Sequence, residues 1–224
     1  EASRLRMSGR PAEALTALDE ALRLASSDSE AVDALWRIAW LHEAAVPTPA
    51  RAKAVEIYER IVRDYPNAAS APRAYHRLGQ LRWYGTHGEL DVVVLPLWIA
   101  FGGGPAATEL FANPRTQEQV FASLRQSCHY REALPYFEKG AAAAQNFNPW
   151  SLACRYMLAE ANILMGNRDE AVKILREIAL LDLADVTPEN SGGDASYPQA
   201  REAGGSMEDV RILVASARRN ARML

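Results

Sequence analysis

Two stretches of the chain follow the same pattern, and this repetition constrains the fold more than any other feature. Residues 35–66 read LWRIAWLHEAAVPTPARAKAVEIYERIVRDYP, and residues 152–182 read LACRYMLAEANILMGNRDEAVKILREIALLD. Each contains a helix with apolar periodicity, a short turn, and a second helix in which a small alanine precedes large apolar residues. A repeat of about 34 residues with this content is typical of stacked helical hairpins. Such hairpins usually provide an interaction surface rather than a catalytic pocket.

Length, composition and charge exclude several other classes of protein. At 224 residues the chain can bury a sizeable core, and 49% hydrophobic with 24% charged residues is ordinary for a globular protein. The net charge of −3 and the lack of a long basic run argue against a nucleic-acid binder. The longest apolar run, residues 92–101, contains Pro96 and is far shorter than the roughly 20 residues of a membrane helix. We therefore expect no nucleic-acid partner and no transmembrane segment.

The two cysteines are predicted to be free thiols. In the hairpin register Cys128 lies in a turn, whereas Cys154 begins a first helix at the other end of the layer. A helix of about 12 residues would separate them by roughly 18 Å, whereas a disulfide needs Cα atoms within about 7 Å. Free thiols favour a reducing compartment without excluding the periplasm. Because the chain begins with Glu1 rather than Met, a mature or trimmed chain is expected, and periplasmic and cytoplasmic locations both stay open.

The repeat resembles the tetratricopeptide repeat (TPR) family. That family has a small residue late in the first helix, a glycine near the turn, an alanine early in the second helix, and large apolar residues after it. The last hairpin supplies Ala159, Gly166, Ala171, Leu175 and Ile178. The hairpin around residue 54 supplies Ala39, Ala54, Tyr58, Ile61 and the closing Pro66. The resemblance implies an all-α, right-handed solenoid of antiparallel helical hairpins.

The remaining hairpins fit this pattern less well. Near the start, Gly9, Ala14, Leu18 and Ala21 fit a second helix whose partner would begin before Glu1. Residues 72–84 form a good first helix, and its second helix is expected within residues 88–104, where Pro96 and three valines favour a kinked or short helix. Residues 116–145 are expected to form a third hairpin. There Ala133 and Phe137 fit, whereas Gly140 stands where a larger residue is usual.

These observations divide the chain into three parts. Residues 1–183 form the TPR-like domain, with an irregular apolar and glycine-rich insertion at 85–115. Residues 184–206 are rich in Pro, Gly, Ser and Asp, so a loop is expected. Residues 207–224 are expected to form a capping helix, since a solenoid must cover the apolar face of its last repeat. Its apolar face would carry Val210, Leu213, Val214 and Ala217.

Motifs that carry catalysis or metal binding are missing from the sequence. The four histidines occur singly, without a His-x-x-x-His pair, and neither cysteine belongs to a Cys-x-x-Cys. No Gly-x-Ser-x-Gly motif is present, and the triple glycine before Pro105 lacks the Lys-Ser/Thr of a P-loop. We predict a protein that is not an enzyme and has no cofactor and no metal site.

The resemblance implies a partner-binding face on the concave side of the solenoid. The positions that face the groove in the family correspond here to Trp36, Trp40, Arg73, His76, Gln80, Trp83, Arg125, Tyr156 and Glu160, together with Glu118. Aromatic and arginine side chains are frequent binding hot spots. For any single tryptophan, packing between helices is the competing interpretation.

The leading hypothesis is a non-enzymatic scaffold that binds a protein or peptide in this groove. A small helical protein that binds an apolar ligand and a TPR fragment of a larger regulator are the alternatives. Element order in the second half also resembles the TPR-type T component of bacterial TRAP transporters, a family of periplasmic lipoproteins that partner a solute-binding protein. That resemblance implies a transporter-associated role. The sequence leaves the partner and the oligomeric state open.

Overall fold

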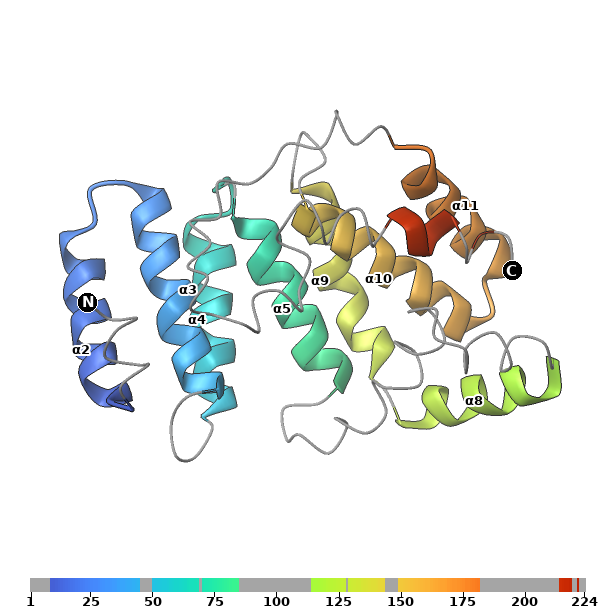
Figure 1. Cartoon of the computed structure of the whole chain (residues 1–224), viewed down its shortest axis with the longest axis horizontal. Coiled ribbons are helices and arrows are strands. Elements are labelled where there is room, and N and C mark those ends of the chain that lie inside the picture. The colour runs from blue at the N-terminus through green and yellow to red at the C-terminus, as the bar shows by residue number, and fades with distance from the viewer. Residues whose placement is uncertain are drawn as a thin grey trace.

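The computed structural model describes residues 9–44, 50–68, 70–84, 114–127, 129–143, 149–181, 214–218 and 221. Helices stack side by side along the long axis of the molecule, from α2 at one end to α11 at the other, and no strand occurs in these ranges (Figure 1). The main elements are α2 (Pro11–Leu24), α3 (Asp28–Ala44), α4 (Arg51–Asp64), α5 (Ala71–Tyr84), α8 (Pro114–Ser127), α9 (Tyr130–Ala142), α10 (Pro149–Met165) and α11 (Arg168–Ala179). The predicted all-α, TPR-like solenoid is confirmed.

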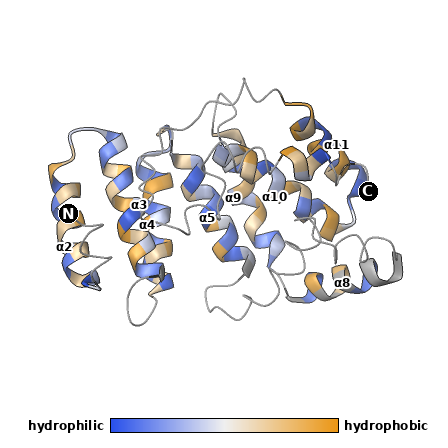
Figure 2. Ribbon diagram, viewed as in Figure 1, coloured by the Kyte–Doolittle hydropathy of each residue, from blue (hydrophilic) through white to orange (hydrophobic). Residues whose placement is uncertain are grey.

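The hairpins α3–α4 and α10–α11 form where the repeat pattern predicts them. Gly166 ends α10 with a φ of 82°, in the left-handed region that glycine adopts without steric cost. Asp169 and Glu170 occupy the first turn of α11, where the positive end of the helix dipole stabilises their negative charges. Apolar residues alternate with polar ones along each helix, so that one side of it is hydrophobic (Figure 2).

The second helices share one register. The small alanine at their start is completely buried in all four: Ala14, Ala54, Ala133 and Ala171. Four residues later a large apolar side chain is also buried, none more than 4% exposed: Leu18, Tyr58, Phe137 and Leu175. Small residues let paired helices approach, and the large residue fills the space between neighbouring hairpins. This repeated packing forms the continuous core.

The central hairpin differs from the prediction. The partner of α5 is α9, which packs against α5 and α10, whereas α8 lies to one side and contacts α10 (Figure 1). The backbone N–H of His129, just before α9, donates to the carbonyl of Trp83 at 3.0 Å. Residues 116–145 therefore do not form a hairpin of their own, and residues 88–104 do not supply the second helix of α5. Residues 85–129 are an insertion within one hairpin, and 85–113 lie outside the described residues.

Two glycines explain how α9 fits this position. A Cβ on Gly79 of α5 would collide with the ring of Phe137. A Cβ on Gly140 of α9 would collide with Cys154 Sγ and would lie 2.9 Å from Cβ of Tyr75. The departure from the family pattern at Gly140 is explained by packing, because α9 approaches both α5 and α10 too closely for a side chain there.

The C-terminal end of the stack is partly described. Val214 and Ala217 are buried against residues of α10 and α11, including Leu152 and Ile178. Arg218 Nε donates to the carbonyl of Ala179 at 2.9 Å. The predicted loop at 184–206, and Val210 and Leu213 of the predicted cap, lie outside the described residues.

Two further expectations concern the thiols and the membrane. Cys154 is a free and fully buried thiol, as predicted, and Cys128 lies outside the described residues. No helix in the described part of the chain is long and apolar enough to span a bilayer.

Candidate interaction surface

Aromatic side chains from successive hairpins contact one another in series, and we call this group the aromatic row: Trp36, Tyr58, His76, Phe137 and Trp150. The ring centroids of Trp36 and Trp150, from α3 and α10, are 6.4 Å apart. The guanidinium carbon of Arg73, from α5, lies 3.8 Å from the Trp36 ring centroid and 5.2 Å from that of Trp150. Each contact is within the range of a cation–π interaction. The row therefore joins three first helices around one cation.

His76 is the inner member of the aromatic row. Its ring centroid lies 5.7 Å from that of Trp150 and 6.1 Å from that of Phe137, and only 4% of its surface is exposed. Burial lowers the pKa of His76 to about 4, because desolvation disfavours the charged imidazolium. Within the described part of the chain, His76 Nδ1 and Trp150 Nε1 are buried without a hydrogen-bond partner. A neutral imidazole and an indole N–H thus retain unused hydrogen-bonding capacity.

Glu160 on α10 is a buried acid. It is 7% exposed, and burial raises its pKa to about 8. Among the described residues it has neither a hydrogen bond nor an ion pair. Desolvation disfavours the carboxylate, so the side chain is mostly a neutral carboxylic acid at pH 7.

A polar network holds α3, α4 and α5 together beside the aromatic row. Tyr58 donates its hydroxyl to Glu43 Oε2 at 3.2 Å, and Arg77 Nε donates to the same oxygen at 3.0 Å. Arg77 also donates to Gln80 Oε1 at 2.9 Å. Because Glu43 is buried with two partners, losing either would leave a carboxylate incompletely satisfied. This network fixes the spacing of the first helices.

The predicted partner-binding residues fall into two groups. Trp36, Arg73 and His76 come together in the aromatic row, and Trp36 and Arg73 remain partly exposed. Tyr156 lies one helical turn before Glu160 on α10 and is partly exposed. The structure therefore brings part of the predicted set to adjoining first helices.

The others lie elsewhere. Trp83 is 0% exposed and packs edge-on against Phe137, so its predicted position on an open groove is wrong. Trp40 packs against the cluster between α2 and α3. Gln80 belongs to the polar network described above. Arg125 sits on α8, where it pairs with Glu118, and α8 is not a first helix of the stack.

Trp150 and the ion pair between Glu43 and Arg77 were not predicted from the sequence as parts of this surface. Trp150 follows Asn148-Pro149, a typical helix start, so its place in the first turn of α10 was readable from the sequence. The contact between Trp150 and Trp36 could not be predicted from the sequence, because this contact depends on how the split hairpin of α5 and α9 spaces α3 and α10.

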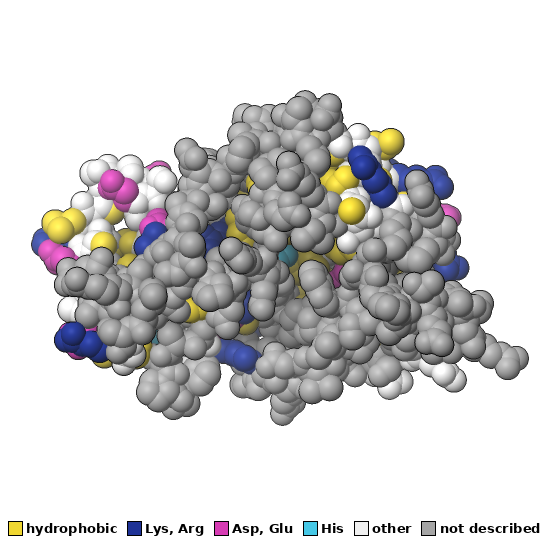
Figure 3. Space-filling view, in the orientation of Figure 1, with side chains coloured by type: hydrophobic (Ala, Val, Ile, Leu, Met, Phe, Trp, Pro, Cys, Tyr) yellow, Lys and Arg dark blue, Asp and Glu magenta, His cyan; other side chains and the backbone are white. Residues whose placement is uncertain are grey.

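The rest of the described surface is mixed in character. Hydrophobic and charged side chains are interspersed among the described residues visible in Figure 3. Within the described ranges, no three His, Cys, Asp or Glu side chains gather in a way that could hold a metal ion.

Comparison with known families agrees with this architecture. A tetratricopeptide repeat model matches residues 33–68, which contain most of α3 and all of α4, and a second matches residues 124–186, which contain α9, α10 and α11. No curated protein matches the chain. Repeats of this family generally mediate protein–protein interaction without catalysis. The two matches and the shared register of the hairpins show that the chain contains tetratricopeptide repeats at residues 33–68 and 124–186.

Proposed function

We propose that this protein is a non-enzymatic scaffold that binds a protein or peptide across the first helices α3, α5 and α10. The observation that carries the proposal is the contact of Arg73 with Trp36 and Trp150, which places one cation and two indoles at the junction of three hairpins. Trp and Arg are the residue types most enriched in binding hot spots.

The chemistry of the site favours an extended segment with acidic and apolar side chains. Arg73 offers a guanidinium that stacking on Trp36 holds in one orientation, which lowers the entropy lost on binding. The partly exposed Trp36 offers an apolar face beside that charge. An acidic group would pair with the cation, and an apolar group next to it would cover the indole.

A photo-crosslinking experiment tests the proposal. A photoreactive phenylalanine analogue at position 36 should crosslink to a partner, and the same analogue at exposed Glu56 of α4 serves as the matched control. With the captured partner purified, Arg73→Ala should weaken binding by about tenfold or more, as expected for a hot-spot residue. Equal crosslinking from both positions, or unchanged affinity in a folded Arg73→Ala, would contradict the proposal.

Native mass spectrometry tests the competing hypothesis, that the protein binds a small apolar ligand. A stoichiometric small molecule that co-purifies with the wild-type chain and is lost from Trp36→Ala would favour an apolar-ligand binder instead. The transporter association remains a prediction, and a solute-binding protein as the crosslinked partner would support it.

A further inference from the structure

Glu160 is a buried acid on α10, one of the three first helices of the proposed binding face. It is 7% exposed, and among the described residues it has neither a hydrogen bond nor an ion pair. Tyr156, one helical turn before it, is partly exposed. Burial of an ionisable group without a partner is costly, and buried polar groups in native proteins are normally paired. A buried carboxyl without a partner beside a proposed binding face indicates that its partner belongs to the bound molecule.

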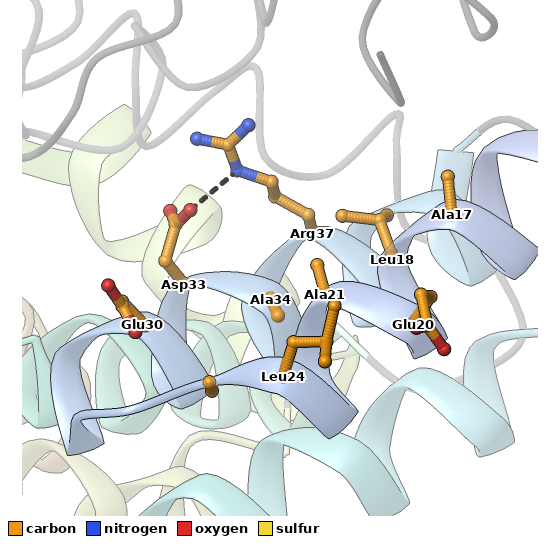
Figure 4. Close-up of a pocket in the computed structure, with 10 residues that line it drawn as sticks. Ala17, Leu18, Glu20, Ala21, Leu24, Glu30, Asp33, Ala34 and Arg37 are labelled. Carbon is orange, nitrogen blue, oxygen red and sulfur yellow. Dashed lines mark ion pairs between the residues drawn. The ribbon is translucent and has the colours of Figure 1, made fainter.

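Other acids at the described surface already have partners within the chain. In the groove between α2 and α3, Asp33 pairs with Arg37 at 2.9 Å (Figure 4). On the rim of the same groove, Glu20 pairs with Arg23 at 2.6 Å, and Glu30 accepts a hydrogen bond from a backbone N–H at 2.7 Å. All three acids are exposed. Glu160 differs from them because it is both buried and without such a partner.

Glu43 of α3 shows how this fold satisfies a buried acid. It is 8% exposed, and its Oε2 accepts hydrogen bonds from the Tyr58 hydroxyl at 3.2 Å and from Arg77 Nε at 3.0 Å. Arg77 comes from α5, the neighbouring first helix, so the acid is paired across two hairpins. A buried carboxylate is stable when a cation with good geometry compensates its charge. A basic side chain is therefore the partner that matches Glu160.

The positions of Glu160 and Arg73 along their helices set the distance between them. Both α5 and α10 run antiparallel to α9, so they are parallel to each other. The two helices are also level, because Cys154 Sγ of α10 lies 3.8 Å from the carbonyl oxygen of Pro72 of α5. Arg73 stands six residues before the small residue late in α5, and Glu160 stands one residue after the small residue of α10. This offset corresponds to about 10 Å along the helices, which lie about 9 Å apart.

We infer that the bound segment carries a Lys or Arg about four residues from the acidic residue that pairs with Arg73, and that this cation binds Glu160. The helix offset and spacing together give a span of about 14 Å, which an extended chain covers in about four residues. The inference rests on the proposed function and adds the second charge and its spacing. Opposite charges at the two ends would fix the position of the segment along the face.

Synthetic fluorescent peptides provide the test. Each carries one Asp next to a Leu, a Lys at a separation of about two to about seven residues in either chain order, and Gly and Ser elsewhere. Fluorescence anisotropy with the full chain should show saturable binding that is tightest at a separation of about four residues. Norleucine in place of the Lys keeps the apolar stem without the charge, and it should weaken binding of the best peptide by about tenfold.

Substitutions in the protein locate the cation. Glu160→Gln should remove the preference for lysine over norleucine, and urea unfolding checks that this variant is folded. Glu138→Gln, at an exposed position on α9, is the matched control and should keep the preference. Arg73→Ala should weaken the lysine and norleucine peptides alike, because it removes the contact that they share.

The outcomes separate this inference from the proposed function. Binding that depends on Arg73 but is equal for the lysine and norleucine peptides would overturn the inference and leave the proposed function intact. Equal loss of both peptides in Glu160→Gln, or affinity that does not vary with the separation of the charges, would overturn it as well. Absence of saturable binding by every peptide would also overturn it, and crosslinking from position 36 tests the proposed function independently.

Discussion

Gly79 of α5 lies directly against the ring of Phe137 of α9, so closely that a Cβ at residue 79 would collide with the ring. This contact joins the two helices of one hairpin across the long insertion. It also places Trp83, one turn further along α5, against the same phenyl ring at a centroid distance of 6.0 Å. The split hairpin is therefore held by close packing at residue 79 and by aromatic packing next to it.

Gly79→Ala should destabilise the protein even though alanine is the better helix former. Relief of the collision needs movement of a fully buried Phe137, and such overpacking typically costs about 1–3 kcal/mol. Urea unfolding measures the free-energy change, and Phe137→Leu in the Gly79→Ala background should recover part of the loss. A double-mutant cycle that shows no coupling between the two positions would contradict direct contact.

The hairpins whose two helices are contiguous in the chain were predicted from the sequence. The hairpin of α5 and α9, which a long insertion interrupts, was not. Ala54 and Ala171 could be placed from local spacing, because both helices of their hairpins lie within about 34 residues. Residues 72–84 were predicted to be a good first helix and residues 116–145 a separate, less regular hairpin. Pairing α5 with α9 required a contact across the insertion, which local periodicity does not encode. The same error placed Arg125 on the groove, since α8 was taken as the first helix belonging to α9.

Burial could not be predicted from register alone. Trp36 and Trp83 occupy predicted groove positions on different first helices, yet Trp36 is partly exposed and Trp83 is fully buried. The difference arises because Trp83 lies near the end of α5, where Tyr130 at the start of α9 meets it at a ring distance of 6.3 Å. A position that faces a groove in a regular repeat becomes core where the second helix arrives from elsewhere in the chain.

Ala171→Leu should lower the melting midpoint. Ala171 is completely buried at the start of α11, so extra side-chain atoms would force the helices apart at a typical cost of about 1–3 kcal/mol. Ala52→Leu, at an exposed position on α4, is the matched control and should change stability by less than about 0.5 kcal/mol. Similar midpoints for the two variants in differential scanning calorimetry would show that the crossing at Ala171 is not tight.

Trp83→Ala should mainly reduce stability, whereas Trp36→Ala should mainly weaken partner binding. Truncation of a fully buried aromatic costs about 3–5 kcal/mol, so Trp83→Ala should unfold at much lower urea concentration. Trp36→Ala should lose less stability, because its ring is partly exposed, and should weaken binding of a captured partner. A Trp83→Ala variant as stable as the wild type would contradict the burial of this side chain between α5 and α9.

Stability should pass through a maximum with pH because two buried groups titrate abnormally in opposite directions. The pKa of His76 falls from 6.5 to about 4 on folding, so the unfolded chain binds more protons between these values and stability rises with pH there. The pKa of Glu160 rises from 4.5 to about 8, so the folded chain binds more protons between these values and stability falls with pH there. The two effects oppose each other between pH 4.5 and 6.5.

Between pH 6.5 and 8 only the Glu160 contribution of this pair remains, and the free energy of unfolding should decrease by up to about 1.4 kcal/mol per pH unit. Glu160→Gln keeps the size of the side chain and removes the titration, so its stability should be nearly constant over this interval. The same variant keeps His76 and should still gain stability as pH rises from 4.5 to 6.5, with a steeper slope than the wild type. Urea denaturation at several pH values measures both slopes. A parallel decline of the wild type and Glu160→Gln above pH 6.5 would show that another group, not the buried acid of α10, controls the alkaline side.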